Sequence, residues 1–135
     1  MNPLHPVPGR GSVRYGKPKE RLTGNEQTCV SHLESLGYQV EVLDEDLEKP
    51  ANIDLRLGES GQLWEMKNVG DGKHAIEDNM RNAYHKWVRL GLDASNETRV
   101  VMTSYVDEIR RRMRRYAANV IYIFRDGASS LFLRR

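Results

Sequence analysis

The chain lacks the residues that form covalent cross-links and the apolar runs that span membranes. Cys29 is the one cysteine among 135 residues, so an internal disulfide is impossible and noncovalent packing must hold the fold together. No stretch of about 18 or more apolar residues exists, so we expect no transmembrane helix. Residues 1–16 have no apolar run of the kind found in a secretory signal peptide. The length and the 39% apolar content predict one domain with a core of ordinary size.

Several familiar chemical motifs are also missing. The sequence contains neither a G-x-x-x-x-G-K-[ST] loop nor a G-x-G-x-x-G fingerprint, so nothing supports nucleotide-dependent chemistry. Cys29 and His32 have the spacing of two metal ligands on a helix. No second cysteine and histidine pair accompanies them, so we do not expect a zinc site.

The net charge of +2 hides an uneven distribution along the chain. Residues 1–23 carry +4, residues 24–109 carry −9, and residues 110–135 carry +7. A polyanion would be attracted to the two basic ends, and the acidic middle could hold metal ions. The alternative is that these charges are simply solvated surface groups.

Hydrophobic periodicity predicts the order α-β-β-β-α-β-α-β-β. Residues 1–20 are rich in proline and glycine and predict a linker or extended arm, so the single domain should span 21–135. The domain is predicted to have an α/β fold, in which helices flank a mixed sheet. The predicted helices cover 23–36, 74–90 and the basic stretch 107–117, and the predicted strands cover 38–43, 53–57, 62–67, 98–102, 120–124 and 130–133.

Asp54, Glu65 and Lys67 form the most informative pattern. Glu65 and Lys67 are two residues apart on a predicted strand, so they should lie on the same face of the sheet. Asp54 can come alongside if the hairpin pairs the two strands. Adjacent carboxylates repel each other unless a cation lies between them, and hard oxygen ligands favour Mg²⁺ or Mn²⁺. A nearby lysine can hold a water molecule or stabilise negative charge, as phosphodiester hydrolysis requires.

A solvated Glu65–Lys67 pair on an ordinary strand is the alternative to a catalytic site. Three observations favour the site. Trp64 and Met66 flank Glu65 with apolar side chains, Asp54 occupies the matching place on the preceding strand, and Glu26 opens the helix before both.

These residues resemble the signature of the PD-(D/E)xK nuclease superfamily. The resemblance covers residues 23–102 and implies a restriction-endonuclease-like αβββαβ core, with a basic helix and a C-terminal hairpin added here. It implies metal binding by Asp54 and Glu65, a catalytic role for Lys67, and a carboxylate from Glu26 that completes the metal site as a third ligand or supports it. Ile53 stands where the family has its proline. Many relatives also carry a glutamine on the second helix, where this chain offers Lys86 or His85.

More narrowly, the chain resembles the C-terminal toxin nucleases of contact-dependent growth inhibition and related polymorphic toxins. This resemblance implies an RNase that acts on transfer RNA, a cognate immunity protein, and delivery as the C-terminal part of a secreted toxin. The protein would then be located in the cytoplasm of the producing or target bacterial cell. Two alternative functions stay open. The chain could be a DNA endonuclease of a phage or mobile element, or a non-catalytic module that binds nucleic acid.

The predicted helix 107–117 carries five arginines within two turns. Arginine binds phosphates in a bidentate manner, so the helix could hold a nucleic-acid backbone. Alternatively, it forms a solubilising face or a surface for an acidic partner such as the immunity protein. The expected nucleic-acid contacts are Arg110, Arg111, Arg114, Arg115, Lys86 and His85.

Overall fold

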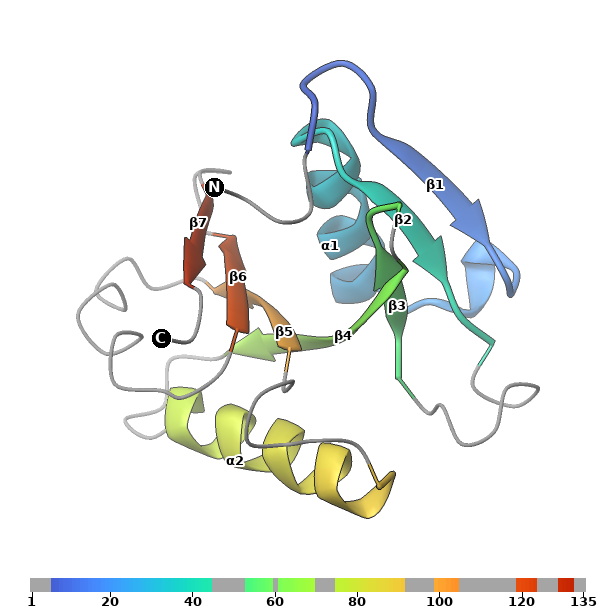
Figure 1. The fold of residues 1–135 in the computed structure, drawn as a ribbon. Coiled ribbons are helices and arrows are strands. Elements are labelled where there is room, and N and C mark those ends of the chain that lie inside the picture. The colour runs from blue at the N-terminus through green and yellow to red at the C-terminus, as the bar shows by residue number, and fades with distance from the viewer. Residues whose placement is uncertain are drawn as a thin grey trace. The chain divides into compact units, whose positions relative to one another are not determined.

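The structure is a computed structural model that describes residues 6–44, 53–59, 61–69, 75–91, 99–104, 119–123 and 129–132. The chain folds as two compact units, unit 1 with residues 1–66 and unit 2 with residues 67–135 (Figure 1). The expectation of one domain over 21–135, preceded by an arm over 1–20, stays a prediction.

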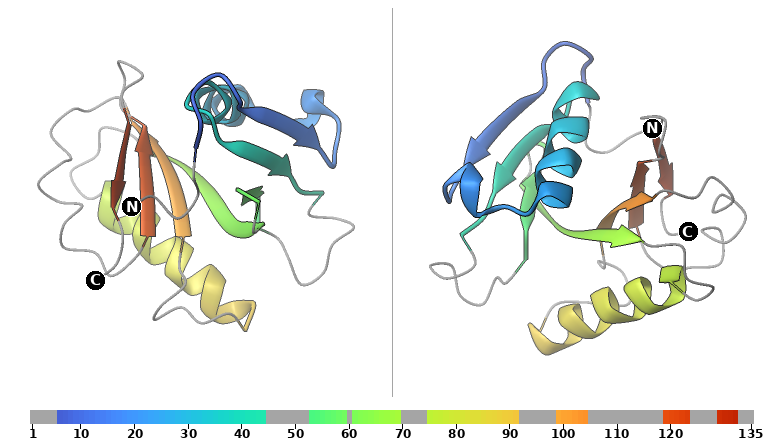
Figure 2. Two further views of the ribbon diagram at one scale, coloured as in Figure 1. Left: turned by 45° about the horizontal axis from the view of Figure 1, so that its top comes forward. Right: turned by 180° about the vertical axis from the view of Figure 1, so that it is seen from behind.

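Unit 1 contains strands on one side of a helix. Its elements are β1 (Ser12–Tyr15), the 3-10 turn η1 (Lys19–Arg21), α1 (Gly24–Ser35), β2 (Gln39–Val42), β3 (Leu55–Leu57) and most of β4 (Gln62–Val69). α1 contacts β1 and β2 and covers one face of these strands, as Figure 2 shows from behind. The buried core of the unit includes Leu33 of α1, Val42 of β2 and Trp64 of β4.

Helix α1 begins and ends where its sequence predicts. The Thr23 hydroxyl accepts a hydrogen bond from the backbone N–H of Glu26, and the Glu26 carboxylate accepts one from the backbone N–H of Thr23. This capping box satisfies two donors that a helix leaves unpaired at its start. At the other end, Gly37 has a φ of 93°, a left-handed conformation that glycine adopts without strain.

The strands of unit 1 form a mixed sheet in the order β1-β2-β3-β4. β1 runs parallel to β2, whereas β2, β3 and β4 are antiparallel neighbours. The tight connection between β3 and β4 uses positive φ angles at Gly58 and Gly61. The predicted hairpin is therefore confirmed, and it fixes the register in which Leu55 faces Trp64.

Strand β1 was not predicted from the sequence. Ser12–Tyr15 pairs with Gln39–Val42, and flanking hydrogen bonds run from the backbone N–H of Val7 to the Gly37 carbonyl and from Gly16 to the Val42 carbonyl. The prolines that suggest an extended arm lie outside these four residues, so they do not interrupt the ladder.

Unit 2 continues from the end of β4. Its elements are α2 (Ala75–Arg89), β5 (Arg99–Ser104), β6 (Asn119–Ile123) and β7 (Ser129–Phe132). β5 and β6 are parallel, β6 and β7 are antiparallel, and the three strands lie side by side in Figure 2. α2 contacts β5, and its buried residues Met80, Ala83 and Trp87 recur at the predicted spacing.

The observed fold confirms the predicted α/β class with mixed parallel and antiparallel strands. The element order from α1 to β5 is the predicted αβββαβ, and β6 with β7 is the predicted C-terminal hairpin. The basic helix predicted for 107–117 lies outside the described residues. Within the described residues, no helix is both long and apolar enough to cross a membrane.

Candidate functional site

Asp54 lies directly before β3, and Glu65 lies on the neighbouring strand β4. The register pairs Leu55 with Trp64, and its continuation by one position would bring Asp54 opposite Glu65. One oxygen of the Asp54 carboxylate, Oδ2, accepts a hydrogen bond from the backbone N–H of Met66 at 2.9 Å. The Asp54 carboxylate is thus held against β4, as the hairpin prediction requires.

Glu65 is deeply buried. Its exposed fraction is 1%, and it is the one charged residue in the buried class among the described residues. Burial of an ionised carboxylate is costly unless hydrogen bonds or opposite charges compensate it. Such a position is unusual for glutamate in a purely structural strand. A buried acid that neighbours a second acid is instead typical of sites where carboxylates act on a ligand.

Helix α1 brings two more groups toward Asp54. The pKa of the Cys29 thiol is raised to about 12, first by burial and then by the negative charges of Asp54 and Glu26. Cys29 therefore lies within electrostatic reach of both carboxylates. Glu26 lies three residues before Cys29 in α1, and one of its oxygens is engaged in the capping box. The role of Glu26 as a third metal ligand stays a prediction.

Lys67 follows Glu65 by two positions in the continuous strand β4. Side chains alternate along a strand, so the two groups leave the backbone on the same side. Lys67 is half-buried. The unit boundary falls between Met66 and Lys67, so a joint action of Lys67 with the carboxylates stays a prediction.

The carboxylate oxygens of Asp54 and Glu65 suit a cation that binds few protein ligands. Within the described part of the chain, no group of three or more His, Cys, Asp or Glu side chains could hold a metal ion. Mg²⁺, however, is commonly held by one or two carboxylates together with water and substrate phosphates. The oxygen pair of Asp54 and Glu65 fits this mode of binding.

The other predicted contacts belong to unit 2. His85 is exposed on α2, and its ring meets that of Tyr84 edge to face at a centroid distance of 5.9 Å. Lys86 is half-buried on the same helix. The choice between His85 and Lys86 stays open. Arg110, Arg111, Arg114 and Arg115 lie outside the described residues.

Two features of unit 1 were not predicted from the sequence. The first is the closeness of the buried Cys29 to the carboxylates, which neither its place in the apolar stripe of the helix nor its spacing to His32 indicates. The second is an ion pair between Arg56 Nη1 and Glu41 Oε1, at 3.2 Å across β2 and β3. The alternation of charged and apolar residues in both strands was a signal for this pair, because opposite charges often face each other across strands.

Comparisons with known proteins place this geometry in a wider context. No family model and no curated protein matches the chain. A solved structure does match. The fold is similar to that of a CdiA-CT toxin domain. It occurs in the CdiA-CT/CdiI toxin and immunity complex from Burkholderia pseudomallei, with a TM-score of 0.62 and 17% sequence identity. The match covers 90% of this chain and 99% of the CdiA-CT chain, and it shows a shared fold.

Proposed function

We propose that this chain is a metal-dependent endonuclease that hydrolyses phosphodiester bonds, and that it acts as a toxin on RNA, with transfer RNA favoured. The observation that carries the proposal is the hydrogen bond from the Met66 backbone N–H to Asp54, which holds this carboxylate against the strand that carries the buried Glu65. The PD-(D/E)xK resemblance of the same residues supports the hydrolytic assignment.

Each residue has a distinct task in this mechanism. Asp54 and Glu65 supply oxygen ligands to Mg²⁺ or Mn²⁺, and the bound cation supplies Lewis acidity toward the phosphodiester. Burial of Glu65 excludes water from its side of the site, which strengthens electrostatic interactions there. The Lys67 ammonium holds the attacking water or stabilises the negative charge that develops on the phosphate oxygens. Glu26 supports the site from α1.

The toxin assignment rests on the fold. The similar CdiA-CT domain is described in a complex with its immunity protein. We propose that this chain likewise has a cognate, acidic immunity protein, and that the basic ends of the chain attract both this partner and the RNA substrate. Action in the cytoplasm of a bacterial cell follows from a transfer RNA substrate.

A cleavage assay tests the proposal. Purified protein is incubated with bulk bacterial transfer RNA and, separately, with plasmid DNA, each in Mg²⁺ or in EDTA. We expect cleavage of the RNA in Mg²⁺ alone. Glu65→Gln and Lys67→Met should abolish cleavage, because they remove a ligand and the ammonium group. Glu59→Gln is the matched control, because Glu59 is exposed in the turn before β4.

Each alternative has its own outcome in this assay. Cleavage of plasmid alone would reject the RNA preference and indicate a DNA endonuclease of a phage or mobile element. Binding of nucleic acid with no cleavage under any condition would indicate a non-catalytic module. Cleavage that persists in EDTA, or in Glu65→Gln, would contradict the metal-dependent mechanism.

A further inference from the structure

Three charged residues form a row across the sheet of unit 1. The register places Arg14 of β1 opposite Glu41 of β2, and Glu41 opposite Arg56 of β3. Residues directly opposite each other on neighbouring strands lie on the same face of a sheet. This charged row, Arg14–Glu41–Arg56, therefore has its three side chains on one face.

The charged row is accessible and has a net positive charge. Arg14 is exposed on the edge strand, the Arg56 side chain is 40% exposed, and that of Glu41 is 31% exposed. The 3.2 Å ion pair holds the Arg56 guanidinium beside Glu41. A solvent-exposed ion pair contributes little to folding stability, so stability alone is a weak reason for two arginines here.

The row runs beside the candidate site. Arg56 lies in the middle of β3, two positions after Asp54, which directly precedes this strand. Beyond the Leu55–Trp64 pair, the continued register would bring Asp54 opposite Glu65. Two residues along a strand span about 7 Å, so a nucleic-acid strand that reaches these carboxylates would pass the Arg56 guanidinium farther along β3.

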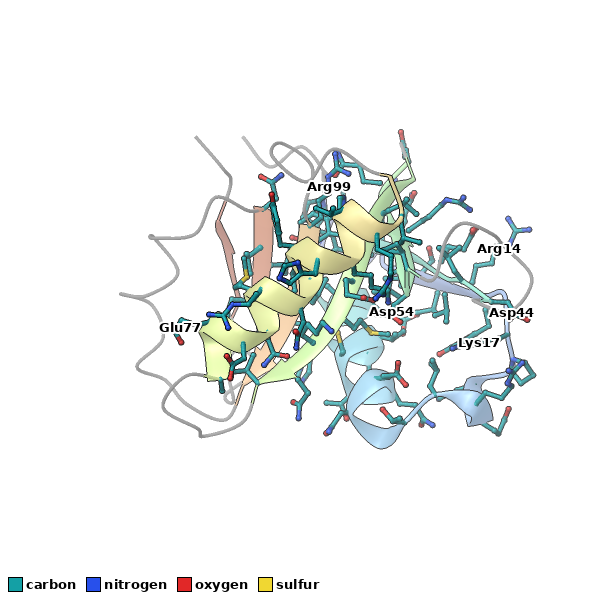
Figure 3. The ribbon with its side chains drawn as sticks, turned by 90° about the horizontal axis from the view of Figure 1, so that it is seen from below. Arg14, Lys17, Asp44, Asp54, Glu77 and Arg99 are labelled. Carbon is teal, nitrogen blue, oxygen red and sulfur yellow. The ribbon has the colours of Figure 1, made fainter. Side chains whose placement is uncertain are left out.

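Further positively charged residues follow Arg14 in the sequence. Lys17 follows β1, and Lys19 and Arg21 form part of η1, so four cations occur between residues 14 and 21 against the single acid Glu20. Figure 3 shows Arg14 and Lys17 toward the β1 side of unit 1, with Asp54 nearer the middle of the unit. Arg21 Nη1 lies 3.9 Å from Asp44 Oδ2.

We propose that Arg14 and Arg56 bind separate phosphate groups of the nucleic-acid backbone, and that Glu41 positions the Arg56 guanidinium for this contact. Two strand spacings put the backbones of the two arginines roughly 10 Å apart, so they would contact different phosphates along one strand. Arginine suits this task because its planar guanidinium forms bidentate hydrogen bonds with phosphate. The proposal rests on the nuclease function, since it assigns a substrate-binding surface to that site.

The test measures binding of labelled bulk transfer RNA in EDTA, so that no cleavage occurs, at KCl concentrations from 50 to 200 mM. Each lost phosphate contact should lower the slope of log K against log salt concentration by about one. We expect Arg14→Gln to lower the slope by about one, and the double variant Arg14→Gln/Arg56→Gln to lower it by about two. Arg56→Lys should keep the wild-type slope, because it retains the charge.

The control variant is Arg81→Gln. Arg81 is an exposed arginine with an ion pair to Asp78 at 3.9 Å, but it belongs to α2 of unit 2. Its loss should leave the slope closer to wild type than the loss of Arg14 does. Thermal unfolding of every variant checks that it is folded. The Arg14→Gln variant keeps the test valid if the double variant fails to fold, since Arg14 lies exposed on an edge strand.

The outcomes separate this inference from the proposed function. Unchanged affinity and slope in folded Arg14→Gln and in the double variant would overturn the inference, even if the wild type cleaves RNA. A wild type that binds RNA through the charged row and never cleaves it would support the inference and contradict the nuclease. Equal losses in Arg81→Gln and Arg14→Gln would also overturn the inference, because binding would then depend on total charge alone.

Discussion

Asp54 accepts a hydrogen bond from the backbone N–H of Met66 through its Oδ2 atom, at 2.9 Å. This bond joins the residue that precedes β3 to the middle of β4. It uses one carboxylate oxygen and holds the side chain against β4 at the residue that follows Glu65. The Asp54 carboxylate thus makes two contributions. It accepts a hydrogen bond, which an amide oxygen could also do, and it carries a negative charge, which an amide lacks.

The substitution Asp54→Asn separates the hydrogen bond from the negative charge. The asparagine carbonyl oxygen can still accept the hydrogen bond from Met66, so we expect a melting temperature close to wild type. Loss of the negative charge should lower the cleavage rate by about a hundredfold or more, since a cation ligand is weakened. Asp54→Ala should lose activity and, in addition, about 1–3 kcal/mol of stability, because the Met66 N–H loses its partner. Full activity in Asp54→Asn would contradict the assignment.

Glu26→Gln tests whether the first turn of α1 does more than cap the helix. Glutamine preserves a capping box, so the free energy of unfolding should change by less than about 0.5 kcal/mol. Thr23→Ala, which breaks the cap and keeps the Glu26 charge, should cost about 1 kcal/mol. If Glu26 supports the metal site, cleavage falls in Glu26→Gln and persists in Thr23→Ala. The opposite pattern would assign Glu26 to the cap alone.

Cys29 should make the protein less stable in alkali. Its pKa is raised from 9.0 to about 12 in the folded state, so between these values the unfolded chain loses the proton and the folded chain keeps it. Stability then falls as pH rises, by up to about 1.4 kcal/mol per pH unit for this group. Urea unfolding of the wild type and of Cys29→Ala from pH 8 to 10.5 measures the difference. Parallel pH profiles for the two proteins would contradict the prediction.

Gly37 should tolerate no side chain. It has a φ of 93°, and an added Cβ would overlap the backbone of Val7, whose N–H donates to the Gly37 carbonyl. We expect Gly37→Ala to cost at least about 2 kcal/mol. Gly24→Ala is the control, because a Cβ at that helical position meets no atom within 4 Å, and the change should be neutral or stabilising. Equal melting temperatures for the two variants would argue against the packing of residues 7–16 on the rest of unit 1.

The parts of the fold that depend on local pattern were predictable. Alternation in residues 62–67 and the tight turn before them determine the β3–β4 register, and that register is what brings Asp54 to Glu65. The capping residues of α1 also act locally, so Thr23 and Glu26 indicated the start of the helix.

The unpredicted parts depend on contacts between distant segments. β1 pairs with β2 across the intervening helix α1, and parallel pairing of this kind has no short-range turn signal. The burial of Glu65 depends on elements that pack against β4, which the alternation of that strand does not reveal. The closeness of Cys29 to Asp54 requires the packing of α1 on the sheet, whereas its spacing to His32 indicated only a helical pair.

Binding of Mn²⁺ in the absence of substrate tests the central claim most directly. Mn²⁺ occupies the same kind of oxygen site as Mg²⁺ and is detected by electron paramagnetic resonance. We predict that the wild type and Glu59→Gln bind Mn²⁺ with equal affinity. Asp54→Asn and Glu65→Gln should each bind it at least about tenfold more weakly, since each removes a charged ligand. Equal Mn²⁺ affinity in all four proteins, with all of them folded, would contradict a cation site at Asp54 and Glu65.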